Sequence, residues 1–205
     1  MPFGSSCNRP CCHATRQARG VTVEELAVLS KRYHLSTGET LEQAASGRLL
    51  AIVFLRHFGC IFTRQILRGL EALRDESARH GARLVIVHML KDGGETRYTG
   101  EHEGVASIAD PERELYHAFG LRRGGCLELF GPKVWIRGLA ALFHGCGAGP
   151  PAGDGLQMPG AFLFRDNRIV ASQPARSASD LPDIRALFRG LRPDDAEQGY
   201  LDDDG

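Results

Sequence analysis

Cys60 occupies the position in this chain that is most typical of a reactive side chain. It lies in the segment FLRHFGCIFTRQ, where an apolar run gives way at Gly59 to a helical pattern. A thiol at the start of a helix faces unpaired backbone N–H groups and the positive end of the helix dipole, and both stabilise the thiolate. The thiolate is the form that attacks peroxides and disulfides. An inert core cysteine is the other interpretation, because free cysteine is among the most buried residue types.

Neighbouring side chains could modify this thiol. Arg56, His57 and Arg64 lie within four residues of Cys60 and could add positive charge. Thr63 follows Cys60 by three residues, about one helical turn. Its hydroxyl could donate a hydrogen bond to the sulfur, or it could cap the first turn of the helix. These residues form the candidate catalytic cluster.

The remaining cysteines fall into two groups. Cys126 and Cys146 lie in a glycine-rich region, and either of them, or an external thiol, could resolve an oxidised Cys60. The segment CNRPCCHATR crowds four potential metal ligands together: Cys7, Cys11, Cys12 and His13. Thiolate and imidazole suit zinc, copper(I) or iron–sulfur centres, but this spacing is not that of a standard zinc finger. We expect no bound metal or other cofactor, and metal binding by this tail is an alternative.

Composition and charge are those of an ordinary globular protein. The 205 residues are 42% hydrophobic and 24% charged, and their formal net charge is zero. We therefore expect neither a nucleic-acid nor a membrane partner. The N-terminus lacks an apolar segment typical of secretion signals, and the apolar run 49–55 is too short to span a bilayer. These features favour a cytoplasmic protein whose cysteines are not a disulfide framework.

Hydrophobic periodicity predicts the elements that position Cys60. Three apolar segments are typical of buried strands: 49–55, 83–90 and 107–109. Helical patterns occupy the segments 23–33, 40–47, 61–80, 110–119 and 180–191, and further helices are expected around 95–104 and 134–143.

Capping and turn residues mark where these elements begin and end. Thr22 and Glu25 have the spacing of a capping box. Asp110 and Asp180 are the expected N-caps of the helices that follow them. The segment GAFLFRDNRIVAS is typical of a hairpin with its turn at Asp166-Asn167. Alternating helices and strands followed by a hairpin indicate a layered α/β domain with a mixed sheet.

Four blocks of the sequence, in this order, resemble the peroxiredoxin-like branch of the alkyl hydroperoxide reductase / thiol-specific antioxidant (AhpC/TSA) superfamily: FLRHFGCIFTRQ, RLVIVHM, ADPERELYHAFGLRRG and GDGLQMPGAFLFRDNRIV. That branch includes selenoprotein-L-like and prostamide-synthase-like proteins. The resemblance covers about residues 40–190. It implies a thioredoxin-like three-layer fold with a central mixed sheet, an N-terminal helical extension and a Gly-rich insertion before the C-terminal hairpin.

The resemblance also assigns site residues. Cys60 matches the first cysteine of the family's C-x-x-C motif, whereas Thr63 stands at the second position, so a disulfide cannot form within the motif. Pro159, in QMPG, matches the proline that thioredoxin-like folds hold in the cis form opposite the reactive sulfur. Together with the nearby cation Arg64, these positions give the residues expected to be catalytic: Cys60, Thr63, Arg64 and Pro159.

The expected function is that of a thiol-dependent oxidoreductase of the peroxiredoxin-like type. Its single reactive cysteine would attack a small-molecule peroxide or disulfide, and an external thiol would restore it. The alternative is a thioredoxin-fold protein that binds a metal, a cofactor or a partner through its Cys-rich N-terminus without redox turnover. The predicted organisation, which is compatible with a homodimer, has four parts: a Cys-rich tail at 1–20, a helical extension at 21–47, a thioredoxin-like domain at 48–191 and an acidic tail at 192–205.

Overall fold

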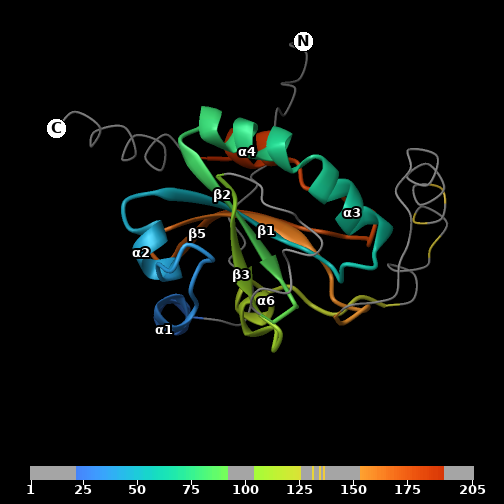
Figure 1. The fold of residues 1–205 in the computed structure, drawn as a ribbon, viewed down its shortest axis with the longest axis horizontal. Coiled ribbons are helices and arrows are strands. Elements are labelled where there is room, and N and C mark those ends of the chain that lie inside the picture. Colours follow the sequence, from blue (N-terminus) through green and yellow to red (C-terminus); the bar gives the residue numbers. More distant parts are fainter. Residues whose placement is uncertain are drawn as a thin grey trace, which may run out of the picture.

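The computed structural model describes residues 22–91, 104–125, 131, 134, 136 and 153–191. At its centre lies a five-stranded sheet with the order β3-β2-β1-β4-β5 (Figure 1). The strands are β1 (Leu49–Phe54), β2 (Ala82–His88), β3 (Ala106–Ala109), β4 (Gly160–Arg165) and β5 (Arg168–Pro174). β1 and β3 each pair with β2 in parallel, whereas β4 pairs antiparallel with both β1 and β5. The predicted mixed sheet is confirmed.

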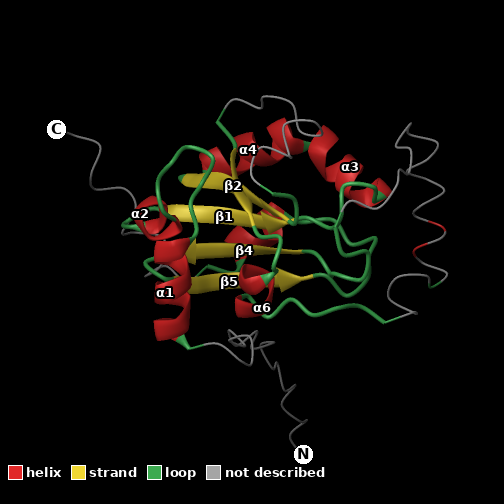
Figure 2. Ribbon diagram, turned by 60° about the horizontal axis from the view of Figure 1, so that its bottom comes forward, coloured by secondary structure: helices red, strands yellow, loops and turns green. Residues whose placement is uncertain are grey.

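Helices cover both faces of this sheet (Figure 2). One layer consists of α1 (Val23–Arg32), α2 (Leu41–Ala45) and α6 (Glu114–Ala118), and the other of α3 (Ile61–Arg68), α4 (Leu70–Arg79) and α9 (Ile184–Arg189). Successive side chains of β1 point into alternate layers, with Leu50, Ile52 and Phe54 on the first side and Leu49, Ala51 and Val53 on the second. The α/β class with three layers is therefore confirmed.

The central strand β1 explains where the candidate site lies. All of its residues are buried, since neighbouring strands flank it and helices cover both its faces. Beyond its carboxyl end, Leu55 donates its N–H to the Val87 carbonyl at 2.9 Å. The buried Tyr116 hydroxyl lies 2.6 Å from the Leu55 carbonyl and 3.1 Å from that of Val87. These contacts fix the chain immediately before Arg56.

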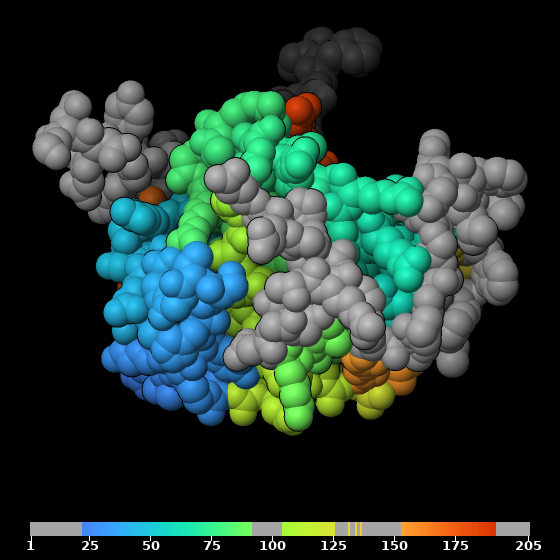
Figure 3. All heavy atoms as spheres, viewed as in Figure 1, coloured from blue at the N-terminus to red at the C-terminus, as the bar shows by residue number. Residues whose placement is uncertain are grey.

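The N-terminal helices pack directly on the sheet. The predicted capping box of Thr22 and Glu25 is present at the start of α1. A second capping box, of Thr40 and Gln43, begins α2. Both helices contribute to the same apolar cluster as β1, and Figure 3 shows them as one continuous blue surface on this face of the molecule. Residues 23–45 are thus held to the domain by burial of apolar side chains.

The predicted hairpin is also confirmed. β4 and β5 are joined at Asp166 and Asn167, whose φ angles are 48° and 58°. Asx residues tolerate this left-handed conformation, and two such residues in succession are the requirement of a type I′ turn.

The prediction of a single helix over 61–80 is wrong. The structure has two helices, α3 and α4, which meet at Gly69 with φ −94° and ψ 11°. The Gly69 N–H lies 3.2 Å from the Gln65 carbonyl and 3.0 Å from that of Ile66, a tightened last turn. Because Ile66 and Leu70 belong to one apolar cluster, the stripe continues across the break and periodicity could not reveal it.

Asp110 is not the N-cap of the next helix, contrary to prediction. The helix α6 begins at Glu114, after Arg113 in the left-handed conformation with φ 63°. The buried Asp110 carboxylate nevertheless accepts hydrogen bonds from the backbone N–H groups of Glu114, Leu115 and Tyr116 at 2.9, 2.9 and 3.2 Å. Asp110 therefore stabilises the helix start from one turn upstream.

Asp180 is likewise not the N-cap of the closing helix. The residue before a proline avoids the helical region, so Leu181-Pro182 delays the helix. Asp183 is the N-cap of α9, and its carboxylate accepts a hydrogen bond from the Ala186 N–H at 3.0 Å. Asp180 instead accepts hydrogen bonds from the N–H groups of Arg176 and Ser177, each at 3.0 Å.

Several predictions fall outside the described residues. They concern the two tails, the helix expected around 95–104 and most of the helix expected around 134–143, of which Val134 and Ile136 are described and are helical. They also concern five cysteines and one histidine: Cys7, Cys11, Cys12, His13, Cys126 and Cys146. These stay predictions. In the part of the chain that the structure describes, no helix combines the length and apolar character needed to cross a membrane.

Candidate active site

Cys60 is the N-cap residue of α3, at the edge of the sheet where β1 ends. Its N–H donates a hydrogen bond to the His57 carbonyl at 2.9 Å, which closes a turn, and its carbonyl accepts one from the Arg64 N–H at 3.1 Å. The side chain makes no capping hydrogen bond and is 6% exposed. The sulfur is thus held between a fixed strand end and the first turn of a helix.

Arg56 is the side chain that contacts this sulfur. Its Nη1 lies 3.1 Å from Cys60 Sγ. Its Nε and Nη2 donate to the carbonyl oxygens of Gln157 at 3.2 Å and Gly155 at 2.5 Å. The guanidinium is buried, and none of the described carboxylates forms an ion pair with it. Within the described part of the chain, Nη1 of Arg56 therefore has the Cys60 sulfur as its partner in place of a carboxylate.

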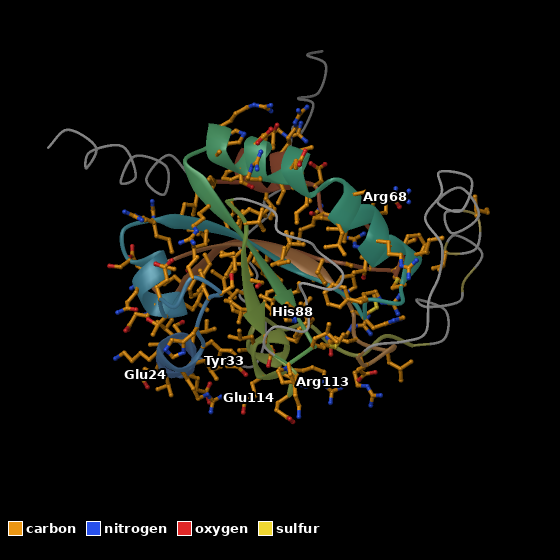
Figure 4. All side chains as sticks on the ribbon, viewed as in Figure 1. Glu24, Tyr33, Arg68, His88, Arg113 and Glu114 are labelled. Carbon is orange, nitrogen blue, oxygen red and sulfur yellow. The ribbon has the colours of Figure 1, made fainter. Side chains whose placement is uncertain are left out.

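The two carbonyls belong to a turn over residues 153–158 that is itself firmly held. Asp154 Oδ1 accepts a hydrogen bond from the Leu156 N–H at 2.9 Å, and its backbone carbonyl accepts one from the Gln157 N–H at 3.2 Å. The second carboxylate oxygen, Oδ2, pairs with Arg113 and, at 3.1 Å, with Nε of Arg123. Figure 4 labels Arg113 beside α6, below the sheet.

His57 does not supply the positive charge that the sequence suggests. Burial lowers the pKa of its imidazole, the nearby Arg56 cation lowers it further, and Asp154 only partly offsets these effects. His57 is therefore neutral near pH 7. Its Nδ1 is buried and has no hydrogen-bond partner among the described residues.

Arg64 and Thr63 lie in the first turn of α3. The side chain of Arg64 is half-buried and, among the described contacts, forms no hydrogen bond with the sulfur. Thr63 is 1% exposed, and its Oγ1 has no hydrogen-bond partner within the described part of the chain. Both roles suggested for the Thr63 hydroxyl, a bond to the sulfur and a helix cap, are therefore absent from this structure.

The expected cis proline is wrong: the Met158–Pro159 bond is trans, as are all peptide bonds of the described residues. The trans bond leads the chain straight into β4, where Gly160 pairs with both Phe54 and Pro174. The Pro159 carbonyl accepts a hydrogen bond from the Ala175 N–H at 3.1 Å, which extends this ladder. Pairing on both sides of β4 thus fixes an extended chain at this proline.

Pro159 lies instead on the wall of a groove of about 880 Å³. Phe62 and Gln65 of α3 also line this groove, as does the segment that leads from β5 to α9. Neither Cys60 nor Arg56 lines this groove. The structure therefore brings Cys60 and Arg56 together but places Pro159 in a neighbouring feature.

Sequence reasoning singled out Cys60 but did not distinguish Arg56 from the other nearby cations, and it missed Asp154. A run of glycines and prolines around Asp154 gave only a loop prediction. The partners of Asp154 lie 31 and 41 residues before it in the sequence, at Arg123 and Arg113. No local pattern could have identified that cluster.

Comparison with known proteins places the chain in a family. The model of a family described as "AhpC/TSA antioxidant enzyme" matches residues 69–177, just over half of the chain. The matched range includes Asp154 and Pro159 but begins after Cys60. A search of curated protein sequences gives no match.

Several solved structures match the chain, and a peroxiredoxin is among them. A cysteine-to-serine mutant of peroxiredoxin 6 from Arenicola marina matches with a TM-score of 0.52 and 13% identity, over 77% of this chain and 66% of that one, slightly less than two thirds. Mycobacterium tuberculosis AhpC matches with a TM-score of 0.46 and 14% identity, over 72% and 69% of the two chains. The bacterioferritin comigratory protein of Xanthomonas campestris gives 0.45 and 18%, over 69% and 78%.

The likeness to peroxiredoxin 6 confirms the predicted thioredoxin-like fold. At this identity it carries the fold alone, so the roles of individual residues rest on the geometry around Cys60. From its sequence match and its three-layer mixed sheet, the chain belongs to the AhpC/TSA antioxidant enzyme family.

Proposed function

We propose that this protein is a thiol-dependent oxidoreductase in which the Cys60 thiolate reduces a small hydroperoxide. The observation that carries the proposal is the distance of 3.1 Å between Arg56 Nη1 and Cys60 Sγ at the start of α3. A buried cation beside the sulfur stabilises the thiolate more strongly than an exposed one would, since the local dielectric constant is low.

The chemistry that this arrangement supports is a two-electron transfer. The thiolate attacks one peroxide oxygen, the S–O bond forms and the O–O bond breaks. The sulfur is oxidised to a sulfenate, and the hydroperoxide is reduced to an alcohol, or to water from hydrogen peroxide, as the leaving oxygen takes up the proton of the attacked oxygen. A proton from solvent then converts the sulfenate into the sulfenic acid. Arg56 has five N–H donors, of which three are used in the described contacts. The other two could stabilise the charge that develops on the leaving oxygen.

Burial of Cys60 favours a small substrate. With 6% of the residue exposed, the sulfur can be reached by a small hydroperoxide far more easily than by a disulfide on another folded protein. We propose that the other predicted residues act around this sulfur: Thr63 through its hydroxyl, which has no partner among the described residues, Arg64 as a cation at the helix start, and Pro159 as a residue that lines the groove.

Recovery of the thiolate requires a second thiol. Thr63 excludes a disulfide within the motif, and Cys60 is the one cysteine among the described residues. We propose an external thiol, which attacks the sulfenic sulfur, releases water and leaves a mixed disulfide. A second external thiol then forms a disulfide with the first and frees Cys60. Cys126 and Cys146 are the intramolecular candidates for the same step.

The proposal is tested by trapping the sulfenic acid. The reduced protein is pulsed with one equivalent of hydrogen peroxide, treated with dimedone and digested, and adducts are located by mass spectrometry. We expect the adduct at Cys60 in the wild type, none in Cys60→Ser, and formation slowed by roughly 10-fold or more in Arg56→Met, as for loss of an electrostatic stabiliser. Arg185→Met, which removes a distant paired cation, is the control.

An unchanged adduct yield in Cys60→Ser, or no adduct in the wild type, would refute the proposal. Elemental analysis of the same preparations examines the metal-binding alternative. Stoichiometric zinc, copper or iron that is lost when Cys7, Cys11 and Cys12 are replaced by serine would favour that alternative over redox turnover.

A further inference from the structure

We propose that Asp154 is a positioning residue for the Cys60 site: it holds the turn whose carbonyl groups direct Arg56 at the sulfur. The inference rests on the proposed function and extends it to a residue that touches neither Cys60 nor Arg56 through its side chain.

Two hydrogen bonds to Asp154 shape the turn. The side chain of Asp154 accepts a hydrogen bond from Leu156 N–H, and its backbone carbonyl accepts one from Gln157 N–H. The first bond orients the Gly155 carbonyl, because this carbonyl and the Leu156 N–H belong to one planar peptide unit. The second bond holds the next peptide unit of the turn, immediately before the Gln157 carbonyl. The other carboxylate oxygen of Asp154, Oδ2, accepts no hydrogen bond within the turn and pairs with cations outside it.

Two ion pairs connect the turn to other segments of the chain. Asp154 Oδ2 pairs with Arg113, the residue before α6, and with Arg123, in the segment that runs alongside the turn. The Asp154 side chain is 17% exposed, so water screens these ion pairs only in part. Arg113 adopts φ 63°, a conformation that costs a non-glycine residue free energy and persists where other contacts hold it.

Carbonyl groups of the turn hold the Arg56 guanidinium. The carbonyls of Gly155 and Gln157 hold its Nη2 and Nε. Because the guanidinium is planar and rigid, fixing two of its nitrogens fixes the third, and Nη1 then points at Cys60 Sγ. A rotation of the turn would therefore move the cation away from the sulfur.

The turn is closely packed by the segments around it. Gly153 has φ 112°, and a Cβ added there would lie 3.2 Å from Met89 Cβ and 3.5 Å from His57 Cβ. On the other side, Gly124 N–H donates to the Leu156 carbonyl at 2.7 Å, and Met158 N–H donates to the Arg122 carbonyl at 3.2 Å. The turn is thus packed between two segments, and the ion pairs of Asp154 select its position.

The matched test is Asp154→Asn against Glu76→Gln. Asparagine keeps an oxygen for the Leu156 N–H but removes the charge that pairs with the two arginines. Glu76 is a suitable control because its side chain is 13% exposed and also pairs with two arginines, Arg79 and Arg185, away from Cys60. Rates of Cys60 alkylation by iodoacetamide, followed on the Cys60 peptide from pH 5 to pH 9, and rates of oxidation by hydrogen peroxide are compared.

We expect Asp154→Asn to slow both reactions between about 5-fold and about 100-fold near pH 7, the range for displaced supporting groups. The alkylation profile should move to higher pH, which a loss of stability alone would not produce. Glu76→Gln should keep the wild-type rates. Arg123→Gln, which removes the more exposed partner, should give a smaller effect of the same sign and provides a second variant if Asp154→Asn folds poorly.

A double-mutant cycle shows whether Asp154 acts through Arg56. In the Arg56→Met background, Asp154→Asn should have no further effect on the rates. An equal slowing in both backgrounds, or wild-type rates in Asp154→Asn and Arg123→Gln while Arg56→Met is slow, would overturn the positioning role and leave the proposed function intact. If Cys60→Ser and Arg56→Met themselves change nothing, the proposed function fails instead.

Discussion

At the scale of single residues, Thr63 carries a buried hydroxyl without a hydrogen-bond partner in the described structure. We therefore expect its removal to change the stability of the protein and the rate of Cys60 oxidation in opposite directions. An unpaired buried hydroxyl costs about 1–3 kcal/mol of stability. Such a cost is often retained at functional sites, where a group acquires its partner only during the reaction. One turn from Cys60, the peroxide or sulfenate oxygen would be that partner.

Thr63→Val should therefore raise the free energy of unfolding of the reduced protein by roughly 1–3 kcal/mol, because the isosteric methyl removes the unpaired hydroxyl. The same variant should slow oxidation of Cys60 by peroxide. Urea unfolding and dimedone-trapping rates measure the two effects. Thr63→Ser retains the hydroxyl and should retain the rate, and a valine variant with lower stability and an unchanged rate would contradict both expectations.

His57 gives a pH dependence of stability. Its pKa in the folded protein is lowered, chiefly by burial, whereas the unfolded chain takes up a proton near pH 6.5. Its contribution to stability is thus fully present above about pH 6.5 and is lost as the pH falls toward the lowered pKa.

We expect His57→Gln to remove that part of the acid destabilisation, so that the stability difference between pH 7.5 and pH 5 becomes smaller than in the wild type. Urea unfolding at the two pH values measures it. His117→Gln, at an exposed position of α6, serves as the matched loss of an imidazole. A wild-type pH dependence in His57→Gln would show that other groups cause the acid destabilisation.

At the scale of elements, the helix α3, which follows Cys60, ends at its junction with α4 at Gly69. Gly69 has a negative φ of −94°, which any residue can adopt, and a Cβ there would meet only the Gln65 and Ile66 carbonyls, at 3.7 Å. The break therefore does not require glycine for steric reasons. Gly81, by contrast, has φ 67°.

Gly69→Ala should be tolerated and should stabilise the protein by about 0.4–1 kcal/mol, because alanine reduces the conformational entropy of the unfolded chain. Gly81→Ala should destabilise it by roughly 1–2 kcal/mol, the cost of a left-handed conformation. Chemical denaturation of the two variants, side by side, provides the comparison. Destabilisation by Gly69→Ala equal to that of Gly81→Ala would show that the junction needs a glycine.

At the scale of the whole molecule, one buried side chain joins a helix of one layer to the ends of two strands. The Tyr116 hydroxyl lies within hydrogen-bond distance of the carbonyls of Leu55, after β1, and Val87, in β2. Its ring packs edge-on against Phe54 at 4.9 Å between centroids. Tyr33, labelled in Figure 4 near Glu114, similarly connects α1 to α6 through hydrogen bonds to Asp110 and Glu114.

Tyr116→Phe keeps the packing but leaves buried carbonyl groups without this donor, so it should lower the free energy of unfolding by about 1–3 kcal/mol. Equilibrium urea unfolding tests this. Tyr33→Phe, at a half-buried position where water can replace the lost bonds, should cost less. An equal or larger loss in Tyr33→Phe would show that the buried hydroxyl is not the stronger connection.

The sequence alone predicted most of the described elements and the position of the thiol at the start of a helix. Continuous apolar runs indicated strands buried on both faces, paired side chains indicated the capping box at Thr22 and the hairpin at Asp166-Asn167, and the end of β1 placed Cys60 at a helix start. These features could be predicted because burial and capping leave patterns among residues a few positions apart.

The side chains that surround the thiol could be identified only from the tertiary structure. It placed Arg56, out of the nearby cations, against the sulfur and paired Asp154 with two arginines. It also kept Pro159 trans and left the Thr63 hydroxyl without a hydrogen-bond partner among the described residues. The hydrogen bonds that hold Arg56 join residues 99 and 101 positions apart. Contacts at that separation depend on how the layers pack against the sheet, so the spacing of residues along the chain cannot predict them.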